Sequence, residues 1–260
     1  MGSDSHTPDV ETPGRPRRPS VIRQLCLLLV LLPALACEAP RDQRAAEPVQ
    51  ELRIAPETRA RADVLHELAK AHEPALTQAL QSLTRSQQAR LHGLSHRFKT
   101  TDSLARKIQT RMDAGQATRP DQVDIEDALR YTILIEDDPK GHYDSVARHV
   151  LESLEALGHE VKLVKNYWPR GDTYAGLNCV LAFADGFPWE LQFHTIGSLA
   201  AIQEGHGLYE VLRLPGTPRG EKQRLFDKLT TRWDWVLVPE GILVPGSVHP
   251  KEVLRTHKRP

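Results

Sequence analysis

The sequence contains little cysteine, few aromatic residues and no excess of charge of either sign. Its 260 residues include three cysteines (Cys26, Cys37 and Cys179), whose spacing matches neither a metal site nor a disulfide framework. Aromatic residues make up 5% of the chain and the formal net charge is +0, so nothing indicates a protein that coats nucleic acid or binds DNA. The length allows one medium domain with a leader, or at most two small domains.

Several common catalytic motifs are also absent. The sequence has no G-x-x-x-x-G-K-[ST] phosphate loop, no G-x-G-x-x-G after a strand, no G-x-S-x-G nucleophile elbow and no His-Asp dipeptide. His92 and His96 stand four residues apart, but no cysteine or third ligand lies near them in the sequence. Zinc needs three or four ligands, so we interpret these two histidines as solvated side chains.

Residues 1–37 have the features of an export leader. Four arginines precede an apolar run from Leu25 to Ala36, and Cys37 follows it directly. A basic flank, a short apolar core and small residues before a cleavage point are typical of secretory signals. We expect a disordered N-terminus with a signal or lipoprotein-type leader over 1–37, then a linker over 38–56. The protein would then be exported or anchored to a membrane. The alternative is a mis-assigned start, with Val21 as initiator and a cytoplasmic location.

Hydrophobic spacing predicts one folded domain over residues 57–240, followed by a tail over 241–260. Apolar positions at helical spacing predict a helix over 57–91 that is broken near Pro74. The later elements are expected, in order, as a helix from Thr101 to Gly115, a strand at 125–136, a helix at 142–157, a strand at 161–167, a hairpin of strands at 177–183 and 187–194, and helices at 199–212 and 221–231.

This order predicts an α+β fold, with a small, mixed, mainly antiparallel sheet flanked by helices. A doubly wound fold is disfavoured because strands and helices do not alternate strictly.

The strand at 187–194 alternates between two kinds of side chain. Trp189, Leu191 and Phe193 share one face. The other face carries a carboxylate, an amide and an imidazole from Glu190, Gln192 and His194. On pattern alone this is either an edge strand with a solvated face or a row of functional groups.

Two other segments carry charged groups suited to phosphate chemistry. Asp127 and Arg130 stand three apart in an apolar strand, which places them on opposite faces. Asp127 either binds a cation such as magnesium or lies at a strand end in water. A basic cluster around a capped helix start faces either a polyphosphate or solvent; its members are Arg97, Lys99, Arg106 and Lys107.

Aromatic side chains lie beside cations later in the chain. Lys165 and Tyr167 come just before Tyr174 and Asn178. Aromatic faces of this kind stack on a purine while the cations contact phosphate, although aromatic residues at a strand end are also ordinary core residues.

Together, these segments resemble the RelA/SpoT alarmone-synthetase family in content and order. Residues 96–107 (HRFKTTDSLARK) are similar to the family's arginine–x–lysine–x–x–x–serine opening, and residues 127–130 (DALR) to its strand with the metal aspartate. Tyr174 stands where the family has a tyrosine that stacks on the acceptor guanine. Residues 190–195 (ELQFHT) resemble the glutamate–x–glutamine–x–arginine–threonine strand.

The sequence departs from the family pattern at three places. Asp127 stands three residues before Arg130 instead of five, His194 replaces the usual arginine, and Tyr174 is followed by Ala-Gly-Leu-Asn. These features are similar to exported or toxin-type members, and they bear on the acceptor nucleotide more than on the reaction.

The resemblance implies transfer of pyrophosphate from ATP to a ribose 3′-hydroxyl. Asp127 and Glu190 would hold Mg²⁺, and Glu190 would also act as the base. Contacts to ATP phosphates are implied for Arg97, Lys99, Arg106, Lys107 and Arg130. Contacts to the acceptor are implied for Tyr174, Lys165, Asn178, Gln192 and His194.

Three functions follow from this resemblance. The first is a synthetase that makes (p)ppGpp from GDP or GTP. The second is a secreted toxin that modifies adenosine nucleotides or tRNA 3′ ends and is neutralised by an immunity protein. The third is a non-catalytic nucleotide-binding lipoprotein. The family's hydrolase activity is not expected, because its His-Asp pair is absent and the chain is too short for the hydrolase half.

Overall fold

Five helices and six strands make up the part of the chain that the computed structural model describes, residues 52–169, 173–214 and 216–255. The strands are β1 (Arg90–His92), β2 (Arg130–Leu134), β3 (Glu160–Asn166), β4 (Leu177–Ala182), β5 (Pro188–His194) and β6 (Glu252–Leu254). The helices are α1 (Pro56–Arg85), α2 (Thr101–Asp113), α3 (His142–Ala156), α4 (Ile196–Leu212) and α5 (Arg219–Thr231), with 3-10 turns η1 (Leu94–His96) and η2 (Pro120–Gln122).

The strands form one mixed sheet in the order β1-β2-β5-β4-β3-β6. The pairs β1–β2, β5–β4 and β4–β3 are antiparallel, whereas β2–β5 and β3–β6 are parallel. The expected α+β class with a mainly antiparallel sheet is therefore confirmed, as is the β4–β5 hairpin.

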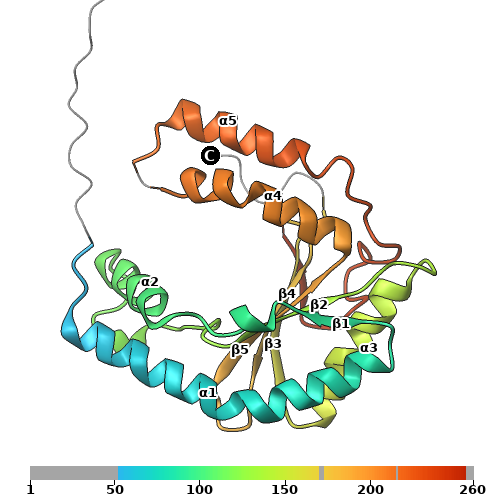
Figure 1. The fold of residues 1–260 in the computed structure, drawn as a ribbon, viewed down its shortest axis with the longest axis horizontal. Coiled ribbons are helices and arrows are strands. Elements are labelled where there is room, and N and C mark those ends of the chain that lie inside the picture. The colour runs from blue at the N-terminus through green and yellow to red at the C-terminus, as the bar shows by residue number, and fades with distance from the viewer. Residues whose placement is uncertain (1–51, 170–172, 215, 256–260) are drawn as a thin grey trace, which may run out of the picture. The chain divides into compact units, whose positions relative to one another are not determined.

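Helices cover both faces of this sheet. Figure 1 shows α1 and α3 on one side and the α4–α5 pair on the other. The hydroxyl of Tyr143 in α3 donates to the Phe193 carbonyl of β5 at 2.7 Å, and Tyr131 of β2 shares a 2.7 Å hydrogen bond with Thr77 of α1. The apolar face of β5 therefore belongs to the core, while its polar face lies on the side of α4 and α5.

Helix α1 is continuous through Pro74, so the expected break is wrong. Buried residues recur along one stripe of the helix, at Ala62, Leu65, Ala69, Leu76 and Leu80. Proline removes one backbone donor, which in α1 would serve the carbonyl of Lys70. Both Pro74 and Lys70 are exposed, so water can serve that carbonyl and the helix need not end.

Strand β2 begins later than expected, and this changes the place of Asp127. Only Arg130–Leu134 is a strand, and Asp127 lies in the segment that leads into it. The amide of Arg130 donates to the carbonyl of Arg97 at 2.8 Å, and the amide of Lys99 donates to the carbonyl of Ala128 at 3.1 Å. Strand alternation therefore does not apply to Asp127, and the expected opposite orientation of Asp127 and Arg130 is wrong, since both line one cavity.

Residues 241–255 belong to the folded unit, so the expected tail over 241–260 is corrected for this described part. Ile242 is 0% exposed and Val248 2%. Strand β6 pairs with β3, and the Asn166 side chain donates to the carbonyl of Ile242 and to Glu252, both at 2.7 Å.

The expected leader over 1–37 and most of the linker over 38–56 lie outside the described residues, as does Cys37. No helix in the described part of the chain is long and apolar enough to cross a membrane. The cysteine within this part, Cys179, is buried and unpaired.

The role of residues 241–255 can be tested with two neighbouring side chains. Ile242→Ala should lower the free energy of unfolding by about 2–4 kcal/mol, because it leaves a cavity in the core. Leu243→Ala is the matched control: Leu243 is 48% exposed, and its loss should cost less than about 0.5 kcal/mol. Urea unfolding of both variants measures the difference. If both substitutions lower the free energy of unfolding by the same small amount, residues 241–255 form a tail and not part of the core.

Candidate active site

Sheet register gathers the polar side chains of three strands on one face. Arg130 of β2 pairs with Glu190 of β5, and Thr132 pairs with Gln192. On the other side of β5, Gln192 pairs with Asn178 of β4. Because paired residues point to the same face, these side chains lie side by side on the face of the sheet that α4 covers.

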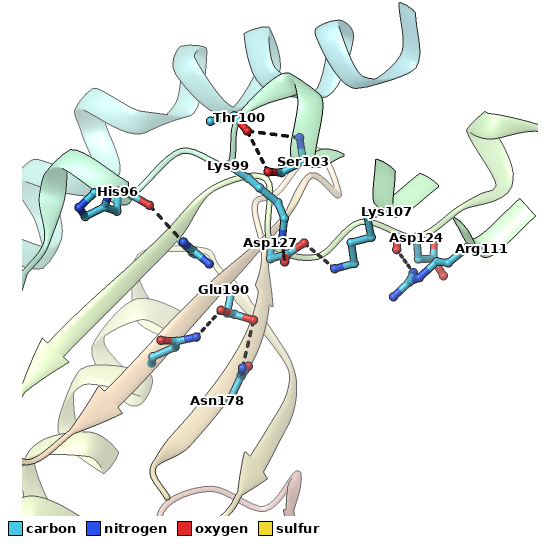
Figure 2. A network of polar contacts seen from close by, with 12 residues as sticks. His96, Lys99, Thr100, Ser103, Lys107, Arg111, Asp124, Asp127, Asn178 and Glu190 are labelled. Atoms are coloured by element: carbon cyan, nitrogen blue, oxygen red, sulfur yellow. Dashed lines mark hydrogen bonds and ion pairs between the residues drawn. The ribbon is translucent and has the colours of Figure 1, made fainter. Parts of the chain in front are cut away.

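The carboxylate of Glu190 is held at both oxygens by side-chain amides. Asn178 donates to one oxygen at 3.1 Å, and Gln192 donates to the other at 2.6 Å. Figure 2 shows Asn178 reaching Glu190 from the neighbouring strand. Each amide has a fixed direction, so the carboxylate is oriented before any substrate arrives.

A second carboxylate, Asp127, lies between two lysines. Lys99 contacts one of its oxygens at 2.5 Å and Lys107 the other at 2.6 Å. Lys99 is held by the backbone pairing of residues 97–99 with 128–130, whereas Lys107 projects from α2. Thr100 caps the N-terminus of helix α2, because its hydroxyl accepts from the amide of Ser103 at 3.2 Å. Figure 2 shows both lysines converging on Asp127 beside Glu190.

The two carboxyl groups have opposite electrostatic surroundings. Burial acts to raise the pKa of Asp127, but Lys107 and Lys99 outweigh it and lower the pKa to about 2. Burial raises the pKa of Glu190, and the charge of Asp127 adds to this effect, against the opposing influence of Asn178, Arg130 and Gln192. Asp127 therefore stays ionised at neutral pH, while Glu190 is the better proton acceptor of the two.

Both carboxylates line a cavity of about 570 Å³ between the sheet and the α4–α5 pair. Seven of the residues predicted from the sequence line it: Asp127, Arg130, Tyr174, Asn178, Glu190, Gln192 and His194. Lys99 and Lys107 lie at the edge of the cavity, where both contact Asp127. A volume of this size is typical of a site for one small organic ligand.

Three predicted residues lie away from the cavity. The guanidinium of Arg97 pairs with Glu73 of α1 at 2.8 Å and lies over the ring of Phe98. Arg106 is on the exposed side of α2. Lys165 forms an ion pair with Glu126 at 3.5 Å. None of these three residues lines the cavity.

Aromatic and imidazole groups form another wall of the cavity. Tyr167 and Tyr174 meet edge to face, with ring centroids 5.2 Å apart. The Tyr174 hydroxyl shares a 2.9 Å hydrogen bond with His194. His194 borders the cavity but is 1% exposed, because Tyr174 and its other neighbours cover most of the imidazole. The direct acceptor contact expected for His194 stays a prediction; in the structure its ring nitrogens lie within hydrogen-bonding distance of Tyr174 and Ser198.

Some lining residues were not predicted from the sequence. His92 and His96, interpreted as solvated, border the cavity from β1 and η1. Helix α4 contributes Leu199, Ile202, His206 and Tyr209. These residues are three, four and three positions apart, which places them on one face of the helix. That spacing is the sequence pattern from which they could have been predicted.

The described residues contain no group of three or more histidine, cysteine, aspartate or glutamate side chains that could hold a metal ion. The carboxylates that line the cavity are those of Asp127, Glu190 and Glu210, and the side-chain carbonyl of Asn178 is a further potential oxygen ligand. That carbonyl oxygen is buried and has no hydrogen-bond partner among the described residues. This set is too small for a protein-only cage.

No protein-family model matches the sequence, and no curated protein matches it. Solved structures do show likenesses. The chain is similar to the type VI effector Tas1, solved with its immunity protein, at 20% identity, with 66% of this chain and 94% of that chain covered and a TM-score of 0.45.

Two small alarmone synthetases from Bacillus subtilis are also similar. Small alarmone synthetase 1, bound to its product pppGpp, is 15% identical over 63% of this chain and 86% of that chain, with a TM-score of 0.43. Small alarmone synthetase 2 is 16% identical over 65% of this chain and 89% of that chain, with a TM-score of 0.45. At identities and scores this low, the likenesses assign no activity to this chain.

The burial of His194 predicts a pH-dependent stability. Burial lowers the pKa of His194 to about 4, whereas histidine in an unfolded chain titrates near pH 6.5. Between these values the unfolded chain binds a proton that the folded chain does not, so stability falls as the pH falls from about 6.5 to 4. This contribution amounts to at most about 3.4 kcal/mol.

His194→Gln should remove this contribution and flatten the stability profile across that pH range. Urea unfolding of the full chain at about pH 4.5, 6 and 7.5 measures it. His149→Gln, at an exposed position on α3, is the control and should keep the wild-type slope. If His194→Gln also keeps that slope, His194 is not buried in its neutral form.

Proposed function

We propose that this protein is a nucleotide pyrophosphokinase that transfers pyrophosphate from ATP to the ribose 3′-hydroxyl of an acceptor nucleotide. The carboxylate of Glu190 carries the proposal, because Asn178 and Gln192 fix both of its oxygens beside a cluster of lysines. A half-buried, oriented carboxylate next to concentrated positive charge suits a hydroxyl attacking a polyphosphate.

The phosphates of the donor, ATP, would bind beside the basic side chains. Lys99, Lys107 and Arg130 surround the edge of the cavity nearest Asp127. Transfer of a phosphoryl-type group depends mainly on positioning and on neutralising charge, which these side chains provide. Arg97 and Arg106 would join them only after moving, since Arg97 pairs with Glu73 and Arg106 faces solvent.

The carboxylates also fit a magnesium ion that arrives with ATP. Magnesium usually takes one or two protein carboxylates, with phosphate oxygens and water completing its shell. Asp127 and Glu190 supply that number, and the unpartnered carbonyl of Asn178 is an acceptor for a metal-bound water or a substrate hydroxyl. When bound, the ion would neutralise charge on the β and γ phosphates. Asp127 would then exchange lysine contacts for the metal, and the lysines would turn to the phosphates.

The reaction itself needs one base and no covalent enzyme intermediate. Glu190 would accept the proton of the 3′-hydroxyl, whose oxygen forms a bond to the β-phosphorus of ATP. The bond from that phosphorus to the oxygen bridging to the α-phosphate breaks, and AMP leaves with the electron pair. The acceptor becomes a ribose 3′-diphosphate.

Tyr174 would stack on the acceptor base, because its ring lines the cavity next to Tyr167. GDP or GTP is the first acceptor to consider, giving (p)ppGpp. Adenosine nucleotides and the 3′ end of tRNA are the alternatives; a secreted toxin with an immunity partner would use one of these. The exported or lipid-anchored location expected from residues 1–37 favours that second role, because ATP is abundant in a target cell.

An acceptor panel tests the function directly. The full chain, Mg²⁺ and labelled ATP are incubated with GDP, GTP, ADP, ATP alone or tRNA, and labelled products are separated. Pyrophosphorylation of any of them supports the enzyme, and the preferred one identifies its acceptor. Nucleotide binding without any product would favour the non-catalytic lipoprotein instead.

Glu190→Gln should reduce turnover at least about 10³-fold, because it removes the base while keeping the shape of the side chain. Nucleotide binding and the unfolding midpoint should change little. Glu160→Gln, on the exposed end of β3, is the matched control and should keep full activity. Turnover by Glu190→Gln within about tenfold of wild type would remove Glu190 from the role of base.

A further inference from the structure

His194 connects two walls of the cavity through its two ring nitrogens. One nitrogen lies 2.9 Å from the Tyr174 hydroxyl, and the other lies 3.0 Å from the Ser198 hydroxyl. The imidazole is on the same face of β5 as Glu190 and Gln192, yet it is 1% exposed because neighbouring side chains cover it.

Ser198 ties the imidazole to the first turn of α4. Its amide donates to the Thr195 hydroxyl at 3.1 Å, and the Thr195 amide donates to the Ser198 hydroxyl at 3.1 Å. This reciprocal capping box fixes the start of α4. The next residue, Leu199, and Ile202 one turn later both line the cavity. The contact to His194 therefore sets the position of the α4 wall against the sheet.

The backbone near Tyr174 is built closely around the same ring. A Cβ atom at Gly176 would lie 2.5 Å from a carbon of the His194 imidazole and 3.0 Å from the Phe193 carbonyl. Gly176 also has φ +151°, which L-residues rarely adopt. Only glycine at this position allows the loop that carries Tyr174 to pack against His194.

We propose that His194 is a positioning residue for the acceptor nucleotide, which holds the Tyr174 ring and the N-terminal turn of α4 in register across the cavity. The proposal rests on the proposed function and assigns to His194 a role behind the substrate, not in contact with it. Both ring nitrogens are engaged by the protein, so the imidazole is not free to bind a phosphate or transfer a proton to the reacting atoms.

Substitutions of His194 can test the roles of its two ring nitrogens separately. A glutamine side chain reaches approximately as far as the nitrogen that meets Tyr174, whereas asparagine reaches approximately as far as the one that meets Ser198. His194→Gln therefore keeps a partner for the Tyr174 hydroxyl, and His194→Asn removes it. Tyr174→Phe removes the same hydrogen bond from the other side and keeps the aromatic ring.

The test compares these variants and the Tyr174→Phe/His194→Asn double variant in a mutant cycle. For the preferred acceptor of the panel, KM should rise about five- to tenfold in Tyr174→Phe and in His194→Asn, the usual effect of losing one such bond. The double variant should be no worse than either single variant, because both remove one interaction. His194→Gln should lie nearer to wild type, and KM for ATP and kcat should stay within about twofold throughout.

Additive effects in the double variant, or an equal rise in KM for ATP, would overturn the proposal and leave His194 a general structural residue. Dissociation constants for GDP and ADP, measured by calorimetry on the same variants, repeat the cycle without turnover.

If the wild-type protein binds nucleotide but yields no product, the proposed pyrophosphokinase activity is wrong, while the mutant cycle still decides the role of His194. If wild type binds neither nucleotide, both proposals fail. Unfolding midpoints show whether each variant is folded, and Tyr174→Phe, which retains the ring, keeps the cycle informative if His194→Asn does not fold.

Discussion

The site depends on one constraint above all, the register that places Glu190 between β2 and β4. Because Arg130, Glu190 and Asn178 come from three adjacent strands, a slip of one residue in either pairing would turn these groups to the core face. The large apolar side chains that alternate with them, Trp189, Leu191 and Phe193, are all 0% exposed and prevent such a slip. The packing of the core against α1 and α3 therefore also positions the polar groups on the opposite face.

Charge is distributed over that face so that two carboxylates can coexist. Asp127 is stabilised as an anion by Lys99 and Lys107, whereas Glu190 is held by neutral amides. When substrate binds, the lysines would pair with the polyphosphate and Asp127 with a magnesium ion, while Glu190 would keep its orientation. The imidazole of His194 is neutral at neutral pH and adds no charge to this balance. In the proposed function, the lysines would neutralise the phosphates, while Glu190 would share the metal with Asp127 and accept the proton.

Much of this could be predicted from the sequence, and the failures have identifiable causes. The alternation in 187–194 correctly predicted which side chains of β5 share a face, and the ordered motifs pointed to seven of the residues that line the cavity, mainly those of the sheet. The break at Pro74 was wrong because an exposed carbonyl needs no intrahelical donor. The tail after residue 240 was wrong because β6 is short and its pairing with β3 is non-local. Arg97 pairs with Glu73, from a distant helix, which no local pattern reveals.

The central claim is that two phosphates move together from ATP, and the fate of the nucleotide tests it most directly. ³¹P NMR or chromatography of a reaction with the preferred acceptor separates AMP from ADP as the nucleotide product. The account predicts one AMP for each acceptor consumed and a diphosphate on the ribose 3′ oxygen. Formation of ADP with a monophosphorylated acceptor, or consumption of ATP with no modified acceptor, would contradict it.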